Sequence, residues 1–141
     1  MEPILQLKYQ RKSTTLENNK KVLVIDDEAH IRRVLELKFK KRGYQVIIAK
    51  NGEQGFDIIQ KQKPDIVISD INMPIMDGKT LCEKTDGLKK DRTFLTIIIT
   101  ARINPMDRDW IDKMQDTLFM EKPFSPARIL EAVEQYIGDQ G

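Results

Sequence analysis

Three carboxylates, one hydroxyl and one ammonium group each follow a short apolar run in this chain. The carboxylates belong to Asp26, Asp27 and Asp70, the hydroxyl to Thr100, and the ammonium to Lys122. Carboxylate oxygens are suitable ligands for hard divalent cations such as Mg2+. A carboxylate can also attack phosphorus and hold the phosphoryl group as an aspartyl-phosphate. If the fold brings these side chains together, they suit magnesium-dependent phosphoryl transfer.

Each of these residues also has an ordinary structural interpretation. Asp26 and Asp27 are of the type that caps a following helix, and Asp70 is of the type that starts a turn. Thr100 is a common β-strand residue, and a lysine such as Lys122 usually faces solvent. The functional interpretation is favoured because all five side chains occur where apolar runs end.

Apolar runs and helical patterns alternate from Val22 onward, which predicts βαβ units and a mostly parallel sheet. The carboxyl ends of parallel strands open onto a ligand crevice, so we expect the reactive side chains to meet at one edge of the sheet. The predicted strands are residues 21–25, 44–49, 66–70, 95–99 and 117–120. The predicted helices are residues 29–42, 52–63, a segment after Gly78, 105–114 and 126–137.

Two helix boundaries and one buried face are also predicted. Gly43 should end the first helix, and Ser125 with Pro126 should begin the last one. The apolar spacing of the first helix predicts one buried stripe, made of Ile31, Val34, Leu35, Leu37 and Phe39.

The composition indicates one globular domain without a membrane segment. The chain has 141 residues, of which 40% are hydrophobic and 33% charged. No apolar stretch approaches the roughly 18 residues of a membrane span, and no signal-peptide pattern opens the chain. A single cysteine, Cys82, excludes an internal disulfide and favours the cytoplasm. The positive charge excess lies in residues 1–21, so no nucleic-acid-binding face is expected on the remainder.

The order and spacing of these motifs resemble the receiver domain of two-component response regulators. From Asp27 to Asp70 is 43 residues, from Asp70 to Thr100 is 30, and from Thr100 to Lys122 is 22. The resemblance extends from about residue 20 to residue 137. Its motifs are Asp26-Asp27, Asp70 with Met73-Pro74 and Asp77-Gly78, Thr100-Ala101, and Lys122-Pro123-Phe124.

The resemblance implies a doubly wound, flavodoxin-like α/β fold. Its five-stranded parallel sheet should have the order 2-1-3-4-5 and be covered by five helices, an arrangement for which a receiver protein is a standard example. The receiver domain would comprise residues 20–138, between a polar N-terminal extension or linker at 1–19 and a C-terminal tail at 139–141. A cis peptide bond before Pro123 is also common in the family.

The resemblance further implies a phosphoacceptor switch that is not an enzyme beyond self-phosphorylation and slow self-dephosphorylation. Asp70 would receive a phosphoryl group from a sensor histidine kinase or a histidine phosphotransfer protein, with Lys122 and Thr100 as catalytic partners. Mg2+ or Mn2+ would be held by Asp27, Asp70 and the backbone carbonyl of Asn72, and Asp26 would act through a bound water. The residues expected beside the phosphoryl group are Ala101 and Met73.

The expected response is a change of the surface formed by the fourth helix, fifth strand and fifth helix, about residues 105–137. Thr100 and Phe119 occupy the positions of the family's switch pair. This chain departs from the family in having Gln115-Asp116 where Gly-Ala is frequent, and Phe119 where tyrosine is frequent. The sequence does not identify the output partner, and the resemblance allows a dimer that forms on phosphorylation.

Two other functions fit the same residues less well. A pseudo-receiver scaffold would bind partners without phosphorylation, but it has no need for the complete set of reactive residues. A magnesium-dependent phosphohydrolase should carry a second acid near the nucleophile, for instance at Asn72. The chain is expected to be a stand-alone receiver or a piece of a longer regulator or hybrid kinase.

Overall fold

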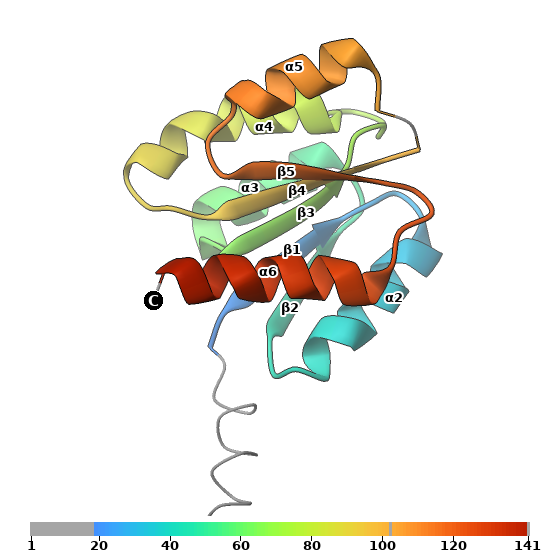
Figure 1. Cartoon of the computed structure of the whole chain (residues 1–141), viewed down its shortest axis with the longest axis vertical. Coiled ribbons are helices and arrows are strands. Elements are labelled where there is room, and N and C mark those ends of the chain that lie inside the picture. Colours follow the sequence, from blue (N-terminus) through green and yellow to red (C-terminus); the bar gives the residue numbers. More distant parts are fainter. Residues whose placement is uncertain (1–18, 102, 141) are drawn as a thin grey trace, which may run out of the picture.

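A five-stranded parallel sheet forms the centre of the protein, as predicted (Figure 1). The structure is a computed structural model that describes residues 19–101 and 103–140. The strand order is β2-β1-β3-β4-β5, which confirms the doubly wound, flavodoxin-like prediction. The strands are β1 (Lys21–Ile25), β2 (Gln45–Ala49), β3 (Ile66–Asp70), β4 (Leu95–Thr100) and β5 (Thr117–Glu121).

In the described residues, five α-helices cover the two faces of this sheet, with α2 and α6 on one face and α3, α4 and α5 on the other (Figure 1). A short 3-10 helix, η1, follows α4 directly. The helices are α2 (Ala29–Lys40), α3 (Gly52–Gln62), α4 (Gly78–Asp86), η1 (Gly87–Lys90), α5 (Pro105–Lys113) and α6 (Pro126–Gln140).

The central strands are buried on both faces, which explains their continuous apolar character. Successive side chains of a strand point to opposite faces, so Val22 and Val24 pack against α2 and α6. Leu23 and Ile25 pack on the other face, in a cluster that includes Ile59 of α3. The two cores therefore hold β1 in a defined register beside β3, which is what positions the chain that follows each strand.

Local sequence signals define where the helices begin and end. Asn51, Asp77 and Asn104 cap α3, α4 and α5, since each side chain accepts a hydrogen bond from a backbone N–H of the first turn at 2.8–2.9 Å. Gly43 follows α2 with φ = 88°, a left-handed conformation that suits glycine after a helix, as predicted. The predicted beginning of α6 at Pro126 is confirmed as well.

One prediction about the buried stripe of α2 is wrong. Leu35 and Phe39 are fully buried, but Leu37 is 55% exposed. Successive helix residues are rotated by about 100°, so Leu37 lies on the face opposite Leu35. Leu88 belongs to η1, which directly follows α4.

The connection before β5 is ordered by a buried lysine and needs no glycine. Lys89 is 5% exposed, and its ammonium donates to the carbonyl oxygens of Gln115 and Asp116 and to Thr117 Oγ1. Burial lowers the pKa of Lys89 to about 8. Asp116 has φ = 44°, and its carboxylate accepts a hydrogen bond from the Tyr136 hydroxyl at 3.0 Å.

Gly78 lies so close to the end of β3 that a side chain should disturb it. A Cβ atom at this position would be 2.7 Å from the carbonyl oxygen of Asp70 and 2.9 Å from Cα of Ile71. We therefore expect Gly78→Ala to lower the free energy of unfolding by about 1–3 kcal/mol, measured by urea denaturation. Gly87→Ala is the matched control, because a Cβ there meets nothing within 4 Å, and it should change stability by less than about 1 kcal/mol. Equal stability of the two variants would contradict the argument.

Candidate functional site

Three carboxylates meet at the carboxyl-end edge of the sheet. Asp26 and Asp27 directly follow β1, and Asp70 is the last residue of the neighbouring strand β3. One carboxylate oxygen from each of the three lies within 4.8 Å of the others. The expected convergence of these side chains is therefore present in the fold.

Burial makes this arrangement electrostatically costly. Asp26 is 1% exposed and Asp70 is 7% exposed, whereas Asp27 faces solvent. Desolvation raises the pKa of the Asp26 carboxyl group to about 6; the Glu28 backbone amide lowers it, and the charge of Asp70 raises it further. The same charges would repel one another less if a cation or a proton were shared among them.

The pKa of Asp70 is also raised, again mainly because its carboxyl group is desolvated. Lys122 opposes this shift most strongly, followed by the backbone amides of Asn72 and Ile71, while the negative charge of Asp27 adds to it. Burial thus disfavours the ionised form of Asp70, whereas Lys122 and two backbone amides favour it.

Lys122 supplies that positive charge from the segment that follows β5. Its Nζ lies 3.7 Å from Asp70 Oδ2, 3.8 Å from Asp26 Oδ2 and 3.3 Å from Glu28 Oε1. Burial alone would lower the pKa of Lys122, but Asp70 and Asp26, together with Glu28, outweigh that effect and raise it. The Lys122–Pro123 peptide bond is cis, as expected.

Two residues near the site were not singled out from the sequence. Glu28 contacts Lys122, and Arg32 Nη1 donates to the backbone carbonyl of Asp26 at 2.7 Å. Asp26 Oδ1 accepts the backbone N–H of Glu28 at 2.9 Å, although neither aspartate serves as the N-cap residue of α2. The sequence signal for Glu28 was its position directly after the aspartate pair, and the signal for Arg32 was its position one helical turn later.

The acidic group fits a divalent cation. Its side-chain donors are all carboxylate oxygens, the type preferred by Mg2+. Asp26 Oδ2 is buried without a hydrogen-bond partner, which is unusual for a buried polar atom and leaves an acceptor available. Asp26, Asp27 and Asp70 can therefore hold a metal ion together, directly or through water.

The other expected site residues lie at the end of β4 and in the segments that follow β3 and β4. Thr100 is the buried last residue of β4, and Ala101 follows it at an exposed position. Asn72 is exposed in the loop after β3, while the side chain of Met73 packs into the apolar core shared with α3. In the same loop, Ile75 adopts φ = 72°, which is strained for a β-branched residue.

Phe119 is outside the acidic group and packs against α4 and α5. It is half-buried, and the guanidinium of Arg108 lies 4.6 Å from its ring centroid. Its apolar neighbours form one cluster with the loop after β3, which links Phe119 to the region of Asp70; the buried members are Ile71, Cys82, Ile98, Trp110 and Ile111.

Comparison with known proteins identifies the family of this site. The family model described as "Response regulator receiver domain" matches residues 22–134. The chain belongs to the response regulator receiver domain family. Receiver domains are regulatory parts of two-component systems, interact with histidine kinases or phosphotransfer proteins, and typically bind Mg2+ in an acidic pocket.

Two curated relatives differ in how much of their length the chain matches. Sporulation initiation phosphotransferase F of Bacillus subtilis is 36% identical over 84% of this chain and 94% of its own length. A probable transcriptional regulator, ycf27 of Guillardia theta, is 37% identical over 81% of this chain but only 44% of its own length. The chain thus spans about half the length of several curated regulators that it matches.

Solved receiver structures share the fold. The chemotaxis protein CheY4 of Vibrio cholerae has a TM-score of 0.75 at 26% identity, covering 83% of this chain and 98% of that one. A CheY-like receiver from Methanospirillum hungatei has a TM-score of 0.80 at 24% identity, covering 87% of this chain and 97% of its own. In residues 19–101 and 103–140, none of the helices combines the length and apolar character required to cross a bilayer.

Because the pKa of Asp26 is raised, we expect Asp26→Asn to stabilise the folded protein by an amount that depends on pH. The folded protein binds the proton of the Asp26 carboxyl group more tightly than the unfolded chain does. The stability that this protonation contributes is therefore lost as pH rises from about 4 to about 6. In EDTA, Asp26→Asn should raise the free energy of unfolding at pH 7 by about 1–3 kcal/mol, and by much less at pH 4.

Denaturant titrations at both pH values measure this effect. Asn keeps an oxygen that can accept the Glu28 N–H, so the variant isolates the charge. Asp57→Asn, at an exposed position on α3, is the control and should show no comparable gain. A gain for Asp26→Asn that is the same at pH 4 and pH 7 would rule out this explanation.

Proposed function

We propose that this protein is a phosphorylation switch in which Asp70 accepts a phosphoryl group from a histidine kinase or a histidine phosphotransfer protein. The observation that carries the proposal is the position of Lys122 Nζ, 3.7 Å from the Asp70 carboxylate within a group of three acids. Residues 20–138 would act as the receiver, with 1–19 as an extension or linker and 139–141 as a tail.

In the proposed reaction, a carboxylate oxygen of Asp70 attacks the phosphorus of a phosphohistidine. A P–O bond forms while the P–N bond breaks, and the imidazole leaves with the electron pair and takes up a proton. Lys122 neutralises charge on one phosphoryl oxygen, and the Thr100 hydroxyl donates a hydrogen bond to another. The small side chain of Ala101 leaves room for the group, and the backbone near Met73 borders it.

Mg2+, or Mn2+, fits the proposed site because the available ligands are oxygen atoms. Asp27 and Asp70 would hold the ion with the backbone carbonyl of Asn72, and Asp26 would act through a bound water. When bound, the ion supplies positive charge that offsets the repulsion between the acids and the incoming phosphoryl group.

The output would follow from a change at Thr100 and Phe119. A phosphoryl group adds about −1.5 to −2 charges at Asp70, which attracts the Thr100 hydroxyl toward it. Phe119 would then move further inward, changing the surface formed by α5, β5 and α6. Half-burial of Phe119, with Arg108 stacked on it, is consistent with a side chain that can move between two positions.

Slow hydrolysis of the aspartyl-phosphate would return the switch to its resting state, without turnover of free substrates. The phosphodonor and the output partner would be cytoplasmic proteins, and a phosphorylation-dependent dimer through the α5–β5–α6 surface is one form the output can take. These proposals extend the family's regulatory role to this chain.

Phosphorylation can be tested directly by intact-protein mass spectrometry. With acetyl phosphate and Mg2+, the wild type should gain one phosphoryl adduct, while Asp70→Asn should gain none because the nucleophile is lost. Asp77→Asn is the matched control in the same loop, since Asn also caps a helix, and it should still be phosphorylated.

Each other outcome has a defined meaning. An unmodified wild type would favour the scaffold interpretation. Phosphate release in large molar excess over protein would favour a hydrolase. An adduct that persists in Asp70→Asn would place the phosphoacceptor elsewhere.

The switch can be followed with 4-fluorophenylalanine at position 119. Beryllofluoride with Mg2+, a phosphoryl mimic, should shift its 19F resonance because the ring becomes more buried. The same label at Phe56, a half-buried residue of α3, should report little change. An identical Phe119 signal with and without beryllofluoride would contradict the proposed switch.

A further inference from the structure

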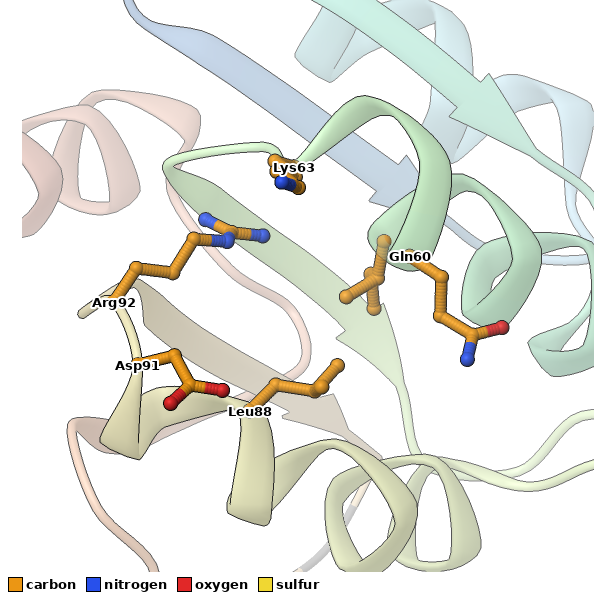
Figure 2. Close-up of a pocket in the computed structure, with 6 residues that line it drawn as sticks. Gln60, Lys63, Leu88, Asp91 and Arg92 are labelled. Atoms are coloured by element: carbon orange, nitrogen blue, oxygen red, sulfur yellow. The ribbon is translucent and has the colours of Figure 1, made fainter.

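A cavity of about 460 Å3 lies at the amino-end edge of the sheet, opposite the edge that carries Asp70. It is bounded by the end of α3, the segment before β3, and η1 with the residues after it. Figure 2 shows the side chains of Gln60, Lys63, Leu88, Asp91 and Arg92 arranged around this space. Ile59 also lines it.

The cavity has an apolar side and a cationic side. Ile59 is buried and Leu88 half-buried, so together they offer an apolar wall. Lys63 and Arg92 are the cations of the lining. Asp91 carries the opposite charge, so the lining residues have a net charge of +1. Within the part of the chain that the structure describes, the Lys63 ammonium has no ion-pair or hydrogen-bond partner.

Arg92 is held in place with part of its hydrogen-bonding capacity unused. Its Nη1 donates to the carbonyl oxygen of Pro64 at 2.8 Å, and its guanidinium lies 4.9 Å from the ring centroid of Phe94. Its Nη2 is buried and has no acceptor. Figure 2 shows the guanidinium directed into the space beside Lys63.

An unused guanidinium N–H beside an unpaired ammonium is a recognition pattern for oxyanions. The planar guanidinium suits carboxylate and phosphoryl oxygens, and a lysine adds a flexible point charge. A buried N–H without an acceptor is unfavourable, so a ligand oxygen that reached it would recover a hydrogen bond. Since Nη2 is covered, binding requires a small rotation of the guanidinium.

We propose that this cavity binds a small organic oxyanion. Its carboxylate or phosphoryl group would lie between Lys63 and Arg92, and its apolar part would contact Ile59 and Leu88. The cavity volume is within the range of small-molecule sites. Since the cavity and Asp70 lie at opposite edges of the sheet, binding should require neither Mg2+ nor Asp70.

The test uses the full chain in EDTA, with phenyl phosphate and benzoate as probes followed by amide chemical shifts. Both probes should bind saturably at millimolar concentration and shift amides of residues 59–63 and 88–92. Inorganic phosphate should bind more weakly because it lacks an apolar part, and benzyl alcohol should not bind because it lacks the charge. Phenyl phosphate and benzoate distinguish phosphoryl from carboxylate ligands.

Variants identify the residues responsible. Arg92→Gln should raise the dissociation constant by about tenfold or more, and Lys63→Gln by about threefold. Arg108→Gln is the matched control, since Arg108 also stacks on a phenylalanine ring but lies outside the cavity, and it should bind as the wild type does. Lys63→Gln removes no hydrogen bond or ion pair within the described structure, so it stays informative if Arg92→Gln fails to fold.

Three results would overturn the proposal. The first is the absence of saturable binding by either probe, and the second is unchanged affinity in Lys63→Gln and in folded Arg92→Gln. The third is loss of binding in Asp70→Asn, which would place the ligand at the other edge of the sheet. None of these results bears on phosphorylation of Asp70, so the two proposals can fail separately.

Discussion

The site holds the carboxylates of Asp26, Asp27 and Asp70 close together, and two of them, Asp26 and Asp70, are nearly excluded from water. This arrangement carries an electrostatic cost on which the properties of the site depend. Asp26 and Asp70 both have raised pKa values because desolvation disfavours their charged forms. Lys122 reduces this cost, but its Nζ is 3.3–3.8 Å from its three acidic neighbours, longer than the roughly 2.7–3.2 Å of a usual N–H···O hydrogen bond. Lys122 therefore compensates the negative charge around it incompletely. The remaining negative charge is what makes this edge a suitable place for a divalent cation.

Apolar packing on the two faces of the sheet offsets the electrostatic cost of this concentration of charge. Parallel pairing sets Ile25 opposite Ser69 and Thr100 opposite Glu121, so the residues that follow β1, β3, β4 and β5 reach the same edge. Strand order matters as much as register, because β1 and β3 are neighbours although α2, β2 and α3 separate them in sequence. Side chains on both faces of the sheet oppose any slip in register. The packing of the interior thus determines the distances between the acids at the edge.

Much of this architecture was predictable, for identifiable reasons. Buried parallel strands appear as continuous apolar runs, so β1, β3 and β4 were evident, and the candidate site residues were chosen from where those runs end. The exposure of Leu37 was missed because an apolar residue in a helix does not have to face the core. The contact of Glu28 with Lys122 joins residues 94 positions apart and depends on side-chain placement. The cavity beside Arg92 likewise arises where separate connections meet, and no short motif encodes it.

The two ends of β5 are held differently, and this difference bears on how a signal can pass through the domain. At its amino end, Lys89 donates to two carbonyl oxygens and a hydroxyl, and Tyr136 fixes Asp116 from α6. At its carboxyl end, Lys122 shares loose contacts among three acids and is bound tightly by none of them. Added charge at Asp70 would change the balance at the loose end first. Because hydrogen bonds from Lys89 and Tyr136 hold the other end, we expect the strand between the two ends to take up the adjustment, and Phe119 is its middle residue.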